Sequence, residues 1–155
     1  MPAVLTATAA GGAIDINTAA GATVTGTTGT GINTFTVDGL TTITTDGAVV
    51  GAASGIVANS VSGVIDIETN STVNSSVGTG VYAATGGVGT VDLDINGDVT
   101  ASTAGVIGTA SGTGTVTINT AAGTTVTTTT GSGVGGFSNS GVIDIVANGI
   151  VSGFT

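Results

Sequence analysis

The chain repeats one short pattern six times, and this repetition limits the folds that it can adopt. Each repeat opens with a glycine, followed by a run in which apolar and polar residues alternate, as in residues 63–68 (GVIDIE). A period of about 25 residues with strand-like runs is typical of a β-solenoid, in which each coil stacks on the previous one. The opening glycines are Gly12, Gly39, Gly63, Gly89, Gly114 and Gly141.

Four sets of apolar residues recur once per repeat and predict the inward-facing columns of the solenoid. Side chains alternate between the two faces of a strand, so every second residue of a run points inward. The first two columns are Ile14, Thr41, Ile65, Val91, Val116, Ile143 and Ile16, Ile43, Ile67, Leu93, Ile118, Ile145. The second wall is Val24, Val49, Val73, Val99, Val126, Val151, and the third wall is Val4, Ile32, Ile56, Val81, Val106, Val134.

These columns predict an all-β chain, folded as a parallel β-helix of about six coils with three short strands per coil. We expect residues 1–155 to form a single β-solenoid domain with repeats that begin near residues 12, 39, 63, 89, 114 and 141. Glycines are expected at the corners because they adopt positive φ without strain. Two-residue insertions at 19–20 and 121–122 should make one corner bulge in the first and fifth coils.

The composition argues against several classes of function. The chain has no Lys, Arg or His and nine acidic residues, for a net charge of −9. No side chain can therefore neutralise phosphate, so we expect no nucleic-acid partner. No stretch is apolar enough to predict membrane insertion. We also expect no enzymatic activity and no required cofactor, because the acids lie on plain strands without His, Cys or a cationic group to assist them.

The motif at residues 114–126 (GTVTINTAAGTTV), followed by Gly133-Val134, resembles the degenerate repeats of autotransporter passengers and other large secreted bacterial adhesins. The other repeats fit the same pattern, so the resemblance covers nearly the whole chain. It implies a parallel β-helix that is displayed outside a bacterial cell as a stalk or adhesive fibre. Neither a barrel-forming segment nor a signal peptide accompanies the repeats, so the export route stays open.

Four acids should stack in the third and fourth repeats, Asp66 over Asp92 and Glu68 over Asp94. Like charges at strand spacing repel each other. A bound Ca²⁺ would relieve this repulsion, because Ca²⁺ prefers carboxylate oxygens. The alternative is that the acids are solvated and only keep the surface soluble.

The two ends of the chain predict self-association. The sixth repeat lacks a third segment, and eight residues separate Val151 from Val4 when Thr155 is followed by a second copy. Uncapped solenoid ends expose unpaired strand edges, and self-complementary ends grow as open filaments. We therefore expect an extracellular structural subunit that stacks head to tail, and the alternative is an adhesin segment that binds host or matrix surfaces. The expected interface contains Val4, Ile14, Asp15, Ile16, Val24, Ile143, Asp144, Ile145 and Val151.

Overall fold

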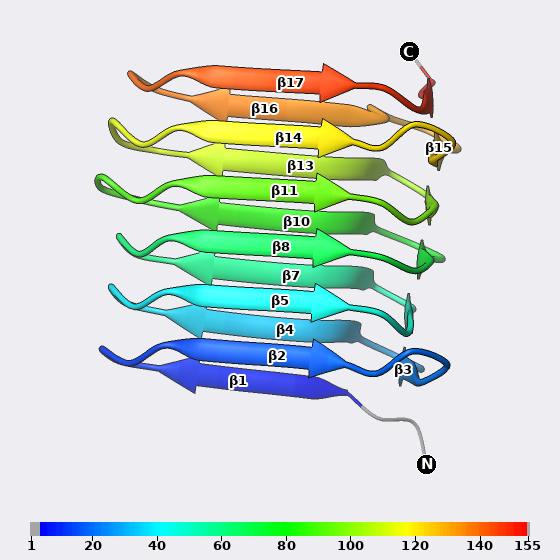
Figure 1. Cartoon of the computed structure of the whole chain (residues 1–155), viewed down its shortest axis with the longest axis horizontal. Coiled ribbons are helices and arrows are strands. Elements are labelled where there is room, and N and C mark those ends of the chain that lie inside the picture. The colour runs from blue at the N-terminus through cyan, green and yellow to red at the C-terminus, as the bar shows by residue number, and fades with distance from the viewer. Residues whose placement is uncertain (1–3, 155) are drawn as a thin grey trace.

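The computed structural model describes residues 4–154, which form eighteen β-strands and no helix (Figure 1). Each strand pairs in parallel with the strand three places further along the chain, so that the chain winds into six coils of three strands each. The predicted parallel β-solenoid is confirmed. Within the described range no helix is long and apolar enough to span a membrane.

The three sheets each contain one strand from every coil. Sheet A contains β1 (Leu5–Ala9), β4 (Thr30–Thr36), β7 (Ser54–Ser60), β10 (Thr79–Thr85), β13 (Ala104–Ala110) and β16 (Val134–Ser138). Sheet B contains β2 (Ile14–Thr18), β5 (Thr41–Thr45), β8 (Ile65–Thr69), β11 (Val91–Ile95), β14 (Val116–Thr120) and β17 (Ile143–Ala147). Sheet C contains β3 (Thr23–Gly26), β6 (Ala48–Gly51), β9 (Val73–Ser75), β12 (Val99–Ala101), β15 (Thr125–Thr128) and β18 (Ile150–Ser152). Figure 1 shows sheets A and B as the long sides of the coil and sheet C as the short side.

The core is built from the predicted columns. The register places Ile65 beside Val91 and Ile67 beside Leu93, and these four side chains are almost completely buried. In sheet C, Val73 lies between Val49 and Val99 in the same way. Stacking of identical side-chain types on successive coils buries a continuous apolar row that no single coil could bury alone.

One member of the third wall was predicted wrongly. Leu5, and not Val4, pairs with Ile32 and packs against the core, whereas half of the surface of Val4 is exposed. Register explains the difference, because Val4 aligns with Gly31 when Leu5 faces Ile32. A Cβ atom at Gly31 would lie only 2.7 Å from Cγ1 of Val49. This position leaves no room for a valine that points inward.

The repeat-opening glycines also have a different reason from the predicted one. Positive φ occurs only at Gly21, Gly87 and Gly123 among the described residues. At the repeat openings a Cβ atom would instead collide with the coil below. A Cβ atom at Gly39 would lie 2.7 Å from the carbonyl carbon of Gly12, and one at Gly114 equally close to that of Gly89. These glycines allow the backbones of successive coils to approach at the corner.

The two insertions form the expected bulges. Ala22 donates its N–H to the carbonyl oxygen of Ala19 at 3.0 Å, and Thr124 bonds Ala121 in the same way at 3.2 Å. Each turn contains one of the positive-φ glycines, Gly21 or Gly123. Figure 1 shows both loops, before β3 and before β15, projecting beyond the other corners.

Candidate functional site

The two ends of the solenoid differ in how much apolar surface they expose. At the lower end Ile14 and Val24 are each only 6% exposed, because strands of sheet A cover them from across the coil, β1 against β2 and β4 against β3. At the upper end Ile143, Ile145 and Val151 are 42%, 40% and 39% exposed. No strand of sheet A within the described residues lies above β16 to cover them. The upper end is therefore an open ledge of inward-pointing apolar side chains.

The expected interface residues all lie on the terminal strands, except Val4, which precedes β1. Ile14, Asp15 and Ile16 are on β2, and Val24 is on β3. Their counterparts Ile143, Asp144 and Ile145 are on β17, and Val151 is on β18. Strands β1, β2 and β3 form one edge of the three sheets, and β16, β17 and β18 form the other. Each end thus presents unpaired backbone N–H and C=O groups, which are templates for further strand pairing.

Gly12, at the lower end, differs from the other opening glycines in its surroundings, and the sequence pattern did not predict this difference. Those five need to lack a Cβ atom because the backbone of a lower coil lies against them. At Gly12 a Cβ atom would meet nothing within 4 Å, and its φ is not positive. The described residues therefore give no reason for glycine at position 12. A further coil beneath it would give one, since its corner carbonyl would occupy this space.

The predicted acid pairs are brought together on the outer face of sheet B. Asp66 pairs with Asp92 and Glu68 pairs with Asp94 across β8 and β11. Burial raises the pKa of the Asp66 carboxyl, and the nearby charges of Asp94 and Glu68 raise it further. Burial likewise raises the pKa of Asp92, with the charges of Asp94 and Asp66 adding to the effect. The folded chain therefore holds protons on these two groups more tightly than an isolated aspartate would.

Asparagine amides at the edge of this ladder were not predicted as partners of the acids. Asn119 donates an amide N–H to Oδ1 of Asp94 at 2.9 Å, and Asn96 donates to Oε1 of Glu68 at 3.3 Å. The positions were visible in the sequence as polar members of the repeat, but the pairing needs the register between coils. Hydrogen bonds to the ionised form stabilise a carboxylate, so the amides offset part of the repulsion.

The ladder does not have the shape of a closed metal site. Within residues 4–154 no group of three or more Asp, Glu, His or Cys side chains is arranged to hold a metal ion. The four predicted ligands lie on the outer face of sheet B, where Asp66 and Asp92 are exposed and Glu68 and Asp94 are half-buried. Calcium binding at Asp66, Glu68, Asp92 and Asp94 remains a prediction.

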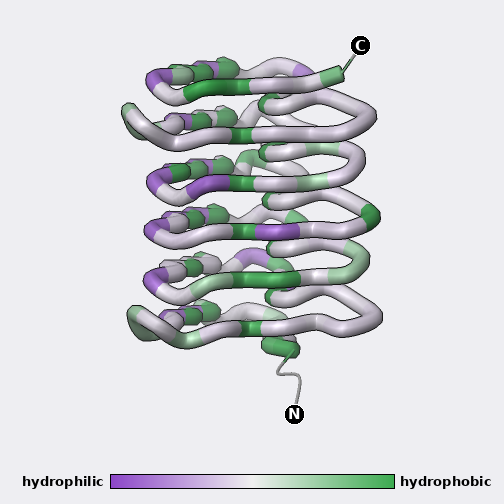
Figure 2. The backbone as a smooth tube through the Cα atoms, turned by 90° about the vertical axis from the view of Figure 1, so that its right-hand side faces the viewer, coloured by the Kyte–Doolittle hydropathy of each residue, from purple (hydrophilic) through white to green (hydrophobic). Residues whose placement is uncertain are grey.

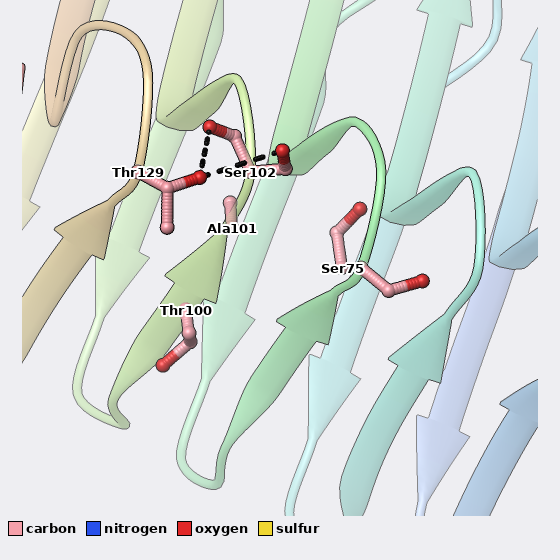
Figure 3. A pocket seen from close by; sticks show the side chains of 6 residues that line it. Ser75, Thr100, Ala101, Ser102 and Thr129 are labelled. Atoms are coloured by element: carbon pink, nitrogen blue, oxygen red, sulfur yellow. Dashed lines mark hydrogen bonds between the residues drawn. The ribbon is translucent and has the colours of Figure 1, made fainter.

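A small open hollow of about 240 Å³ lies where sheet C turns into sheet A (Figure 3). Five of its six lining residues carry a hydroxyl group, namely Ser75, Ser76, Thr100, Ser102 and Thr129, and the sixth is Ala101. The hydroxyl of Thr129 donates to the carbonyl oxygen of Ser102 at 2.9 Å, and that of Ser75 donates to Ala53 at 3.2 Å. The hydroxyls of Ser75, Ser76 and Thr129 thus donate to neighbouring backbone carbonyls, and none of the lining residues is titratable.

Comparison of the chain with protein-family models, with curated proteins and with solved structures found no match.

Proposed function

We propose that this chain is a structural subunit that stacks head to tail into an extracellular β-solenoid filament. The observation that carries the proposal is Gly12. In every other coil the equivalent glycine is in contact with a backbone below it, whereas no residue in the described range 4–154 comes within 4 Å of a Cβ atom built on Gly12. A second copy placed below would bring the carbonyl group of its Gly141 into this space, as Gly114 does for Gly141 within the chain.

The same placement continues all three sheets. Strand β17 of one copy would pair with β2 of the next, β18 with β3, and β16 with β1, which is the order of the strands inside the chain. Strand β1 of the upper copy would then cover the exposed Ile143, Ile145 and Val151. Apolar burial and backbone pairing would both favour this contact. Figure 2 shows the stack from the side, with successive coils at an even spacing that a further copy could continue at either end.

Asp144 of the lower copy would lie beside Asp15 of the upper copy in this register. Like charges in directly opposite positions are destabilising. Assembly should therefore be faster at pH 4 than at pH 7, and it should respond to divalent cations if they bridge the two carboxylates. Equal assembly rates at both pH values and in a chelator would count against this register.

The test is Gly12→Ala, examined by negative-stain electron microscopy and sedimentation velocity. The wild-type chain should form long unbranched fibres at micromolar concentration. Gly12→Ala should fold with an unchanged melting temperature but raise the critical concentration for assembly more than tenfold, since its methyl group would meet the carbonyl of Gly141. Gly29→Ala is the matched control, because Gly29 also has open space around its Cβ position and the next coil has Ala53 beside it.

Two results would overturn the proposal. Wild-type chains that stay monomeric would refute head-to-tail stacking, and Gly12→Ala fibres like those of the wild type would refute the register. Monomers would favour the alternative function, a segment of a secreted adhesin whose solenoid presents its faces to host or matrix surfaces. The resemblance of the repeats to adhesin passengers and the solenoid fold support that alternative.

A further inference from the structure

The acidic residues are distributed very unevenly over the three faces of the solenoid. Six of the nine point outward from sheet B, namely Asp15, Asp66, Glu68, Asp92, Asp94 and Asp144. The other three lie at corners, namely Asp38, Asp46 and Asp98. The strands of sheets A and C carry no charged side chain. A chain without Lys, Arg or His cannot pair oppositely charged side chains with its own copy. Side-by-side association through sheet B is therefore disfavoured by repulsion.

Sheet A is the charge-free face with large side chains. Three of the four aromatic residues, Phe35, Tyr82 and Phe137, point outward from its strands, and Phe35 and Phe137 are 43% and 61% exposed. Its strands are up to seven residues long, whereas those of sheet C have three or four residues, and six of their ten outward side chains are Thr or Ser. Exposed apolar surface on a regular, uncharged sheet is typical of an interaction face.

The outward positions of sheet A follow a simple rule. Two side chains per coil point outward near the middle of each strand, and from the second coil onward one of them is large and apolar while the other is small or polar. Tyr82 is followed by Ala84 and Ile107 by Thr109, whereas Asn33 precedes Phe35. Val57 with Asn59 and Gly135 with Phe137 obey the same rule.

We propose that two solenoids pair face to face through sheet A, related by a two-fold axis parallel to the solenoid axis. This operation places the first outward position of each coil opposite the second outward position of the same coil in the partner copy. Tyr82 then faces Ala84, Ile107 faces Thr109 and Phe35 faces Asn33, so that each large side chain meets a small or polar one. Sheets that pack face to face lie about 10 Å apart, which such interdigitation requires.

The symmetry also suits a filament. A two-fold axis along the solenoid keeps both copies pointing in the same direction, so that both stacks could grow from the same end. The alternative two-fold axis, parallel to the strands, would reverse one stack and bring each column opposite itself. Isologous contacts of the proposed kind are the commonest in symmetric assemblies.

Pairing of this kind rests on the proposed head-to-tail stacking for its strength. Six strands spaced by about 4.8 Å, each about 20 Å long, give a flat area of roughly 500–600 Å² per copy. A standard stable interface buries roughly 800 Å² per partner, so two single chains would pair only weakly. In a filament the contact recurs with every subunit, and linked contacts reinforce each other.

The experiment compares Ala84→Asp with Thr100→Asp in otherwise identical chains. Both changes add one negative charge to the fourth coil, but Ala84 points outward from sheet A and Thr100 from sheet C. Mass per unit length, from scanning transmission electron microscopy, should be twofold lower in Ala84→Asp filaments than in wild-type and Thr100→Asp filaments. Tyr82 is the only tyrosine and there is no tryptophan, so its fluorescence reports on sheet A alone. Quenching by acrylamide should be at least twofold stronger in the unpaired filaments.

Several outcomes separate the two proposals. Wild-type filaments with the mass per length of a single stack would overturn pairing and leave head-to-tail stacking intact, and Ala84→Asp filaments that keep the double mass would also overturn it. If no filaments form, sedimentation equilibrium at roughly 1 mM decides. A dimer that Ala84→Asp abolishes would support pairing without stacking, and a mass of 14.3 kDa at all concentrations would refute pairing.

Discussion

A buried threonine column offers a direct test of how polar groups affect the stability of this core. Thr45 and Thr69 occupy neighbouring inward positions at the ends of β5 and β8 and are fully buried. Neither Oγ1 atom has a hydrogen-bond partner. In the next coil the same position is held by Ile95, which is also fully buried. An apolar side chain therefore fits this column.

Thr69→Val should stabilise the chain. A buried hydroxyl without a partner costs about 1–3 kcal/mol, and valine has nearly the same shape without that group. We expect the free energy of unfolding to rise by about 1–2 kcal/mol, which for a chain of this length raises the melting temperature by about 3–6 °C. Thermal unfolding would be followed by circular dichroism in the Gly12→Ala background, so that association does not add to the measured stability.

Thr18→Val is the matched control in the same column. The Oγ1 atom of Thr18 accepts the backbone N–H of Gly47 at 3.2 Å, so this hydroxyl has a partner. Its removal leaves a buried N–H unpaired and should lower the stability by about 1 kcal/mol or more. Opposite signs for the two variants are the expected result. A loss of stability in Thr69→Val would show that its hydroxyl is hydrogen-bonded in solution and would refute the reasoning.

Four further predictions concern the core, the corners and the acidic ladder. Ile67→Ala should lower the free energy of unfolding by about 3–4 kcal/mol, since Ile67 is fully buried. Gly39→Ala should also lower the free energy of unfolding strongly, because the new methyl group would meet the backbone of Gly12. Thermal unfolding measures both effects. The raised pKa values of Asp66 and Asp92 mean that the folded state binds protons more tightly than the unfolded state. The stability that these two groups contribute is therefore fully present below their ordinary pKa of 3.8, and it is lost as the pH rises through their pKa values in the folded state. The chain should therefore unfold at a higher temperature at pH 4 than at pH 7, and Asp66→Asn should reduce this difference and add about 0.5 kcal/mol at pH 7. If Ca²⁺ binds the ladder, isothermal titration calorimetry should detect heat that Asp66→Asn abolishes, and the absence of heat from the wild-type chain would rule the site out.

Most of the fold was predictable from the sequence because the repeat carries two periods at once. Alternation within each run fixes which side chains point inward, and the period of about 25 residues fixes which coils they stack against. The pairing of Ile67 with Leu93 and of Asp66 with Asp92 follows from these two facts alone. No information beyond one repeat and its neighbour is needed.

The first strand was harder to place, because Val4 and Leu5 are adjacent apolar residues and no complete repeat precedes them. The reason for the corner glycines was also hidden, because a positive φ and a close backbone approach select the same residue. The asparagine partners of Glu68 and Asp94 could not be assigned from one strand. Asn119 faces Asp94 directly in the register of β11 and β14, so the repeat alignment already implies that contact. Asn96 instead reaches Glu68 from the corner after β11, and periodicity does not encode the geometry of that corner.

Position 4 and position 12 together locate where a junction between copies would be tight. Gly12 keeps the glycine of its column although nothing within the described chain requires it, which fits a corner that a neighbouring coil closes. Val4, by contrast, aligns with Gly31, and the later coils also have glycine at this position. In those coils a Cβ atom at the glycine would crowd a core valine. Strand pairing across a junction should therefore begin at Leu5, with close backbone contact at the corner between sheets A and B and a looser fit at the corner between sheets C and A.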